Sequence, residues 1–301
     1  MKRLIASLLL LGMMTAAFAS CTPAVSTSDD ATPSGEQSPS TEASTPEETP
    51  TPTPTPTPSE EPVTPADPAE VLKGKKALFL GDSIVAASGY KFYGWPGRIK
   101  TDYGMLAGKN CGVDGASLSN VRGTNLVVNH MLNNYASDKT KYDFVVLEGG
   151  VNDAWDFYPT GGRPACPIGE VSPGTAEETD ISALDRTTMA GGMEHLLSEA
   201  KRLYPEATII FVFNFKLREG GPGKCGDMDE HIAVQKQICD KWGIPYCNLY
   251  EDTALNKALK VRVSSANVGC VPDGIHPNDR GYDLIAPVIA QFMADTYVKT
   301  H

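Results

Sequence analysis

The sequence predicts a three-layer α/β/α fold around a mostly parallel sheet of about five strands. Three observations support this prediction. Four short apolar runs have the length and composition of strands buried on both faces. Helical patterns lie between successive runs, so strands and helices alternate along the chain. Small and polar residues directly follow two of the runs, at the strand ends where open α/β sheets bind ligands.

The predicted elements follow one another from residue 77 onward. The strong apolar runs span residues 77–80, 144–147, 207–213 and 244–250, and a weaker fifth run spans 105–111. The helical patterns span residues 93–103, 119–135, 183–203, 229–242 and 280–297. A segment from 154 to about 181 interrupts the alternation, and loops of that length are often functional. We expect it to form a pocket wall in which Trp155 and Tyr158 contact substrate, with a plain surface excursion as the alternative.

The residues before the fold have the pattern of an exported and anchored protein. Residues 1–21 combine a basic start, an apolar stretch and small residues before Cys21, which is typical of a signal peptide. Residues 22–68 form a linker rich in Thr, Pro and Glu, with nine acidic residues and no Lys or Arg. Such a segment buries too little apolar surface to fold. The remaining residues, 69–301, are long enough for one domain with a full core.

Charge and cysteine content limit the possible partners. The linker carries most of the net charge of −11, and no basic block appears, which argues against nucleic-acid binding. No cysteine or histidine spacing indicates a metal site, and nothing requires a cofactor. Six cysteines follow Cys21, and their pairing stays open. Cys225 and Cys270 are candidates for a disulfide near the site, whereas Cys239 and Cys247 are candidates for buried thiols. The six are Cys111, Cys166, Cys225, Cys239, Cys247 and Cys270.

The residues at the strand ends are those of an acyl-transfer site. Ser83 follows the predicted strand at residues 77–80, and Asn152 follows the one at residues 144–147. Near the C-terminus, Asp273 precedes His276 by three residues, close enough to hold its imidazole. A serine hydroxyl needs a base to become a nucleophile, and a carboxylate fixes the tautomer of that base. The sequence therefore predicts a catalytic triad of Ser83, His276 and Asp273.

Four blocks of sequence resemble those of the SGNH, or GDSL-type, hydrolases. They are Gly81-Asp82-Ser83-Ile84, with Ile84 replacing the usual Leu, residues 110–117, Gly150-Val151-Asn152-Asp153, and residues 273–278. The resemblance implies the flavodoxin-like fold of that family. It also implies an oxyanion hole made by the backbone N–H groups of Ser83 and Gly115 and the side-chain amide of Asn152, although Gly112 competes with Gly115. The segment 18–21 similarly resembles the lipobox of bacterial lipoproteins, in which the cysteine, here Cys21, is lipidated.

We therefore expect a serine esterase outside the cell. The resemblance implies carboxylic ester substrates, and a domain held on a spacer by a lipid anchor at Cys21 favours O-acetyl esters of carbohydrate. Lipase or lysophospholipase activity, acyl transfer to a sugar, and glycan binding without catalysis are the alternatives. If Cys21 is not lipidated, the protein is secreted instead. We expect a monomer that interacts with an acylated carbohydrate or small ester and with a membrane, but not with nucleic acid.

Overall fold

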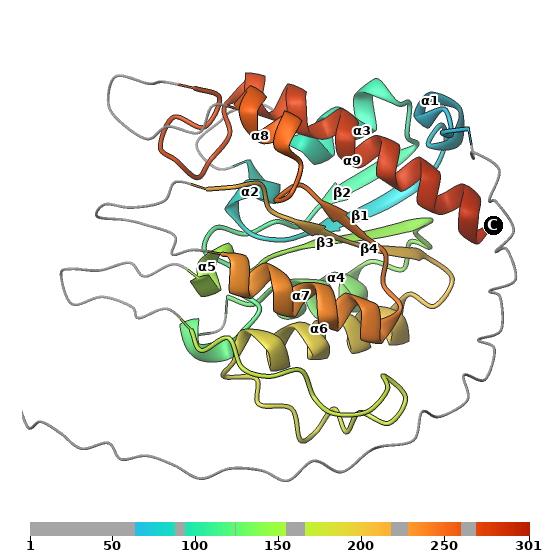
Figure 1. Cartoon of the computed structure of the whole chain (residues 1–301). Helices are drawn as coiled ribbons and strands as arrows, with labels where there is room; N and C mark the ends of the chain where they lie inside the picture. The colour runs from blue at the N-terminus through green and yellow to red at the C-terminus, as the bar shows by residue number, and fades with distance from the viewer. Residues whose placement is uncertain (1–63, 88–93, 124, 155–165, 218–227, 260–268) are drawn as a thin grey trace, which may run out of the picture. The chain divides into compact units, whose positions relative to one another are not determined.

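Five parallel strands form a single sheet with helices on both faces, which confirms the predicted fold class (Figure 1). The computed structural model describes residues 64–87, 94–123, 125–154, 166–217, 228–259 and 269–301. The strand order is β2-β1-β3-β4-β5. The strands are β1 (Lys76–Leu80), β2 (Ala107–Asn110), β3 (Phe144–Glu148), β4 (Thr208–Phe213) and β5 (Tyr246–Asn248).

The central strands form where the sequence is continuously apolar. Every residue of β3 and β4 is buried, as expected for strands covered on both faces. The edge strand β2 is less buried and carries Gly108 and Lys109, which explains its weaker signal. Strand β5 is shorter than its apolar run, because Leu249 and Tyr250 leave the ladder for a turn while staying buried.

The helices pack in two groups. Helices α1, α8 and α3 contact α9, whereas α6 contacts both α4 and α7, so the groups form layers above and below the sheet (Figure 1). The helices are α1 (Pro68–Val71), α2 (Ser83–Ala86), α3 (Trp95–Asp102), α4 (Val127–Ser137), α5 (Val151–Ala154), α6 (Met189–Leu203), α7 (Asp229–Trp242), α8 (Thr253–Leu259) and α9 (Asp279–Thr300), with a 3-10 turn at Asn120–Arg122.

Two helices begin later than the periodicity predicts, because a side-chain cap sets one start and pairing with another segment sets the other. Helix α6 begins at Met189 since Thr188 caps it, accepting the N–H of Gly191 through its hydroxyl at 3.1 Å. Helix α4 begins at Val127 because Leu126 pairs with Ser117 in an isolated bridge. Both starts depend on tertiary or capping contacts that hydrophobic spacing does not report.

The strand order creates a topological switch point between β1 and β3. From β1 the chain crosses to β2 on one side, whereas β4 and β5 lie on the other side of β3. Loops leaving β1 and β3 therefore part from each other at the carboxyl ends of these strands, which is where ligands bind in such folds. Ser83 follows β1 and Asn152 follows β3, so both lie at this point.

The five described cysteines are free thiols. Cys270 is buried, with its Sγ 4.0 Å from the carbonyl oxygen of Ala258, whereas Cys225, the other candidate for a disulfide, lies outside the described residues. Cys239 and Cys247 are buried in the core, and burial raises the pKa of the Cys247 thiol to about 12. Within the described part of the chain, no helix has the length and apolarity needed to cross a membrane.

Candidate active site

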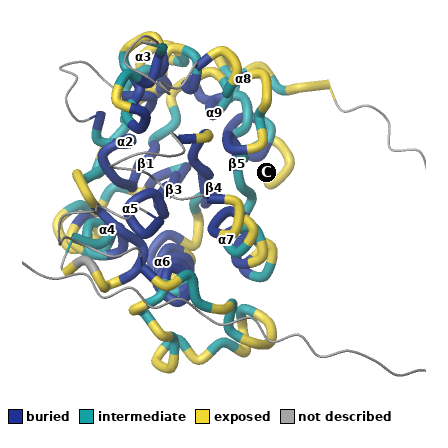
Figure 2. Tube along the Cα trace, turned by 60° about the vertical axis from the view of Figure 1, so that its left-hand side comes forward, coloured by how far each residue is buried: buried dark blue, intermediate teal, exposed yellow. Residues whose placement is uncertain are grey.

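Ser83 is the first residue of α2, a four-residue helix that directly follows β1. Asp82 caps this helix, because its Oδ1 accepts the N–H of Ile84 at 2.8 Å. Two further contacts fix the helix: Asn110 donates from Nδ2 to the carbonyl of Val85 at 2.7 Å, and the Tyr282 hydroxyl donates to the carbonyl of Ile84 at 3.0 Å. These contacts leave Ser83 in a defined place at the end of the sheet, where α2 and α5 are buried beside each other (Figure 2).

The loop before α9 places His276 against Ser83. The Oγ of Ser83 lies 2.8 Å from Nε2 of His276, and Nδ1 of His276 lies 2.7 Å from Oδ2 of Asp273. The other oxygen of Asp273 accepts the backbone N–H groups of Ile275 and His276 at 2.9 and 2.7 Å. The loop therefore orients the carboxylate through its own backbone, and the structure brings Ser83, His276 and Asp273 together.

The charges of this pair support each other. Burial alone would raise the pKa of Asp273, but hydrogen bonds from the side chain and backbone of His276 hold it at about 2. The hydrogen bond with Asp273 raises the pKa of His276 above its ordinary value. Asp273 is then an acceptor at neutral pH, which favours a proton on Nδ1 of His276 and leaves Nε2 free to accept one from Ser83.

Gly115 and Gly112 differ in what their backbones can do. Gly115 is exposed at φ +71°, and its N–H donates to no acceptor among the described residues. The N–H of Gly112 already donates to Oδ1 of Asn110 at 2.9 Å. A Cβ at Gly112 would lie 2.4 Å from the backbone nitrogen of Ala86, so this glycine allows close packing against α2. Among the described residues, therefore, the N–H of Gly112 has a partner and that of Gly115 has none.

Asn152 lies at the start of α5 and is buried. Its Nδ2 donates to the carbonyl of Ala116 at 2.9 Å and to Oδ2 of Asp82 at 3.2 Å. The amide therefore connects the segment after Gly115 to the turn that carries Ser83.

Asp153 and Glu148 are buried acids to which the sequence assigned no distinct role. Asp153 accepts the N–H groups of Leu118 and Ser119 at 2.9 and 2.8 Å, so it fixes the loop that follows Gly115. Glu148 ends β3, is 1% exposed and accepts the backbone N–H of Asp82 at 3.1 Å. A carboxyl group at the end of a buried apolar run predicts a hydrogen-bond donor beside it, because burying a carboxyl group without a partner costs free energy.

Several predicted residues lie outside the described part of the chain. Trp155, Tyr158 and Cys21 are among them, as are all the aromatic residues of the predicted pocket wall. The described residues contain no group of three or more His, Cys, Asp or Glu arranged to hold a metal ion.

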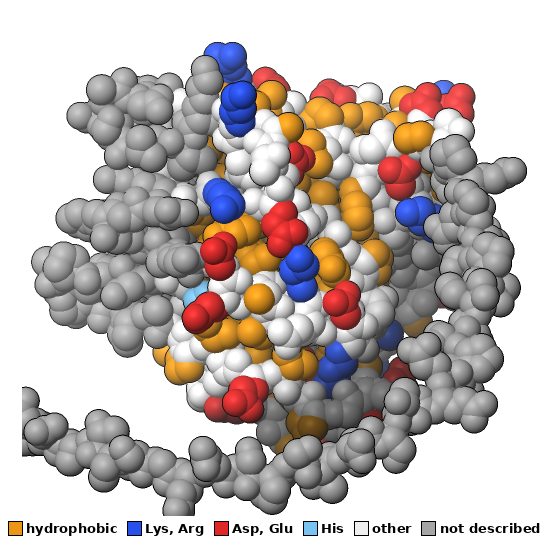
Figure 3. All heavy atoms as spheres, viewed as in Figure 1, with side chains coloured by type: hydrophobic (Ala, Val, Ile, Leu, Met, Phe, Trp, Pro, Cys, Tyr) orange, Lys and Arg blue, Asp and Glu red, His pale blue; other side chains and the backbone are white. Residues whose placement is uncertain are grey.

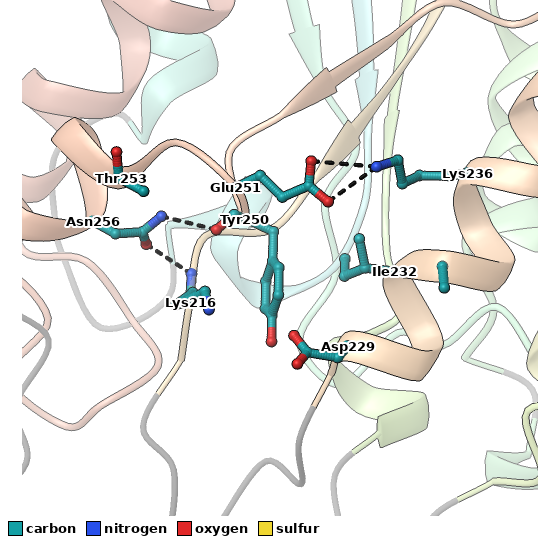
Figure 4. Close-up of a pocket in the computed structure, with 9 residues that line it drawn as sticks. Lys216, Asp229, Ile232, Lys236, Tyr250, Glu251, Thr253 and Asn256 are labelled. Carbon is teal, nitrogen blue, oxygen red and sulfur yellow. Dashed lines mark hydrogen bonds and ion pairs between the residues drawn. The ribbon is translucent and has the colours of Figure 1, made fainter.

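A separate cavity of about 560 Å³ lies after β4 and β5 (Figure 4). Tyr250 points into it, and Lys236 and Glu251 form an ion pair at 3.0 Å on its wall (Figure 4). None of Ser83, His276 and Asp273, which together are called the Ser83 cluster, lines this cavity.

The surface does not single out a site either: acidic and basic side chains are interspersed with apolar ones on the described part of the face in Figure 3. The hydrogen-bond geometry, rather than cavity volume, therefore marks the candidate site.

The chain was compared with known proteins, and a family model matches most of the fold. The model of the GDSL-like lipase/acylhydrolase family matches residues 79–284. A solved protein of Lactobacillus plantarum is 22% identical, with a TM-score of 0.53 over 73% of this chain and 97% of its own. A possible lipase of Chitinophaga pinensis is 18% identical, with a TM-score of 0.52 over 75% and 98%. No curated protein matches the chain. The chain therefore belongs to the GDSL-like lipase/acylhydrolase family, a family of ester hydrolases.

Proposed function

We propose that this protein is a serine esterase in which Ser83 is the nucleophile, His276 the general base and Asp273 the residue that orients it. The observation that carries the proposal is the pair of contacts at His276, 2.8 Å to the Ser83 hydroxyl and 2.7 Å to the Asp273 carboxylate. Both are within the reach that proton transfer requires.

The reaction follows from these contacts. The Oγ of Ser83 attacks the ester carbonyl while its proton passes to Nε2 of His276, and the resulting imidazolium is stabilised by Asp273. His276 then protonates the departing alcohol, which leaves the acyl group on Ser83. A water molecule, deprotonated by His276, attacks this acyl-enzyme and releases the acid and the free serine. In each step Nε2 of His276 takes up or gives back the proton, while Nδ1 keeps its hydrogen bond with Asp273.

The negative oxygen formed at each attack needs donors in place beforehand. We assign these to the N–H of Ser83, the N–H of Gly115 and the amide of Asn152. The exposed N–H of Gly115, which donates to no acceptor in the part of the chain that the structure describes, and the position of Asn152 beside the turn that carries Ser83 support this assignment. One such donor contributes about 2.7–4 kcal/mol in the transition state.

The substrate that we propose is an O-acetyl ester of carbohydrate. The predicted anchor at Cys21 and the Pro-rich linker would hold the enzyme outside the cell, where acetylated polysaccharides occur, and Trp155 and Tyr158 would contact the sugar. Labelling of the full-length protein with an alkyne fatty acid in a bacterial host, beside Cys21→Ser, tests the anchor. Equal labelling of both proteins would rule out Cys21 as the lipidated residue.

Hydrolysis of p-nitrophenyl acetate, butyrate and octanoate by the protein and by Ser83→Ala tests the function. We expect turnover that falls with acyl length and is lost in the variant, and a fluorophosphonate should label only the unsubstituted protein. A preference for octanoate would move the substrate class to lipids. Equal rates in both proteins would remove Ser83 as the nucleophile.

A further inference from the structure

Two carboxyl groups are buried together beneath Ser83. Asp82 is fully buried between β1 and α2, and Glu148, at the end of the neighbouring strand β3, is 1% exposed. Oε2 of Glu148 accepts the backbone N–H of Asp82 at 3.1 Å, which places the carboxyl group of Glu148 directly against Asp82. Gly81 permits this approach, because a Cβ there would lie 2.5 Å from Oε2 of Glu148.

The remaining partners of this pair are neutral donors. Oδ1 of Asp82 accepts the N–H of Ile84, and Oδ2 accepts the amide of Asn152. Oε1 of Glu148 accepts the amide of Asn214, which follows β4. Among the described residues, no Lys or Arg forms an ion pair with either carboxyl group.

Two carboxylates in contact without a cation cannot both be ionised, so the pair holds a proton. The surroundings of Asp82 favour its ionised form, because its carboxylate accepts two N–H groups and lies near the imidazole of His276. The negative charge of Asp153 acts in the opposite direction. Glu148 faces the charge of Asp82 itself, and burial together with that charge holds the pKa of Glu148 well above its usual range. The proton therefore belongs on Glu148.

We propose that Glu148, as the protonated acid, is a positioning residue that holds Ser83 and Asn152 in their reactive places. It fixes the backbone of the turn before Ser83 by accepting the N–H of Asp82. As a neutral acid it leaves the charge on the Asp82 carboxylate, which caps α2 and holds the amide of Asn152. The inference rests on the proposed function, because it concerns the residues assigned there as nucleophile and oxyanion donor.

The role predicts opposite behaviour for two substitutions. Glu148→Gln keeps a neutral side chain of the same length: its oxygen can still accept the N–H of Asp82, while its NH₂ group faces Asn214, whose amide turns to present its oxygen. Glu148→Ala removes the connection. We expect Glu148→Gln to stay within a few-fold of the unsubstituted kcat at neutral pH, and Glu148→Ala to lose about 10²-fold in kcat with little change in KM, as misplacement of reacting groups does.

The pH dependence of stability separates this role from simple packing. The native pKa of Glu148 lies above its unfolded value of 4.5, so stability is lost as pH rises from 4.5 through the native pKa. Glu148→Gln has no such proton to lose. The Tm of Glu148→Gln minus that of the unsubstituted protein should therefore increase as pH rises from about 5 to about 9. Glu206→Gln, at a side chain that is 73% exposed and paired with Lys141, is the matched control and should show no such trend.

The experiment measures Tm, kcat and KM of the four proteins with p-nitrophenyl acetate across this pH range. A Tm difference for Glu148→Gln that is independent of pH would overturn the proposal, as would an unchanged kcat in a folded Glu148→Ala. Failure of the proposed function would be visible in the unsubstituted protein itself, which would neither hydrolyse the ester nor react with a fluorophosphonate.

Discussion

Ser83 Oγ and His276 Nε2 lie 2.8 Å apart, although 193 residues separate them along the chain. The first residue stands at the end of β1 and the second just before α9, and the hydroxyl of Tyr282 on α9 bonds to the carbonyl of Ile84 beside Ser83. This bond ties the two segments together, so the serine and the histidine are held near each other by the Tyr282–Ile84 contact as well as by their own hydrogen bond.

Replacing Asp273 by Asn should reduce turnover strongly and leave the fold intact. The amide oxygen can still accept the N–H groups of Ile275 and His276, but its NH₂ group faces Nδ1 and favours the wrong imidazole tautomer. We expect kcat for p-nitrophenyl acetate to fall by about 10⁴-fold. Circular dichroism and Tm serve as the controls. An unfolded variant would show instead that Asp273 is needed mainly for the loop.

The rate should depend on the protonation of His276. The imidazole acts as a base only when neutral, and Asp273 raises its pKa. We therefore expect kcat/KM to rise with pH and to level off only above an apparent pKa higher than 6.5, the ordinary value for histidine. His195→Gln, on α6 and outside the Ser83 cluster, should leave this profile unchanged. A profile with its midpoint below 6.5 would contradict the assignment of His276 as the base.

Removing the amide of Asn152 should reduce both catalysis and stability. Asn152→Ala loses the proposed oxyanion donor, so kcat should fall by about 10²–10³-fold. It also leaves the carbonyl of Ala116 and Oδ2 of Asp82 without this donor, which should lower the free energy of unfolding by about 1–3 kcal/mol.

Asn134→Ala is the matched control for Asn152→Ala. Asn134 is also buried, on α4, and donates to the hydroxyl of Tyr204 at 3.3 Å. It should lose stability while keeping kcat. The oxyanion assignment fails if both variants lose activity only in proportion to the fraction unfolded.

A buried ion pair far from Ser83 should matter for stability alone. Lys241 contacts Glu194 at 2.6 Å, with their side chains 8% and 0% exposed, and Trp242 donates to the same carboxylate at 3.1 Å. Lys241→Met leaves a buried charge without its cation and should lower the free energy of unfolding by about 3–5 kcal/mol.

Lys236→Met provides the comparison for this ion pair. Lys236 pairs with Glu251, which is 58% exposed, so its loss should lower the free energy of unfolding by only about 0–1 kcal/mol. Urea unfolding of both variants measures the difference. Similar losses would mean that water or local rearrangement compensates Glu194.

Much of the sheet could be predicted from the sequence, because strands covered on both faces must be apolar throughout. Residues 144–147 and 207–213 show this pattern, and the structure places strands β3 and β4 there. Helix starts were harder to predict. Met189 begins α6 only because Thr188 caps it, and Val127 begins α4 only after Leu126 pairs with Ser117, and hydrophobic periodicity contains neither contact.

By itself, the sequence determined the fold class and the residue types of the site, since strand ends in a parallel sheet meet at one edge and Ser83, Asn152, Asp273 and His276 all carry groups suited to acyl transfer. Only the tertiary structure decided how these groups connect. It separated Gly115 from Gly112 through the partner of each N–H, and it placed Glu148 against Asp82. The physical reason is that hydrogen bonds and the burial of charge depend on distances between segments far apart in the chain, which composition and spacing do not contain.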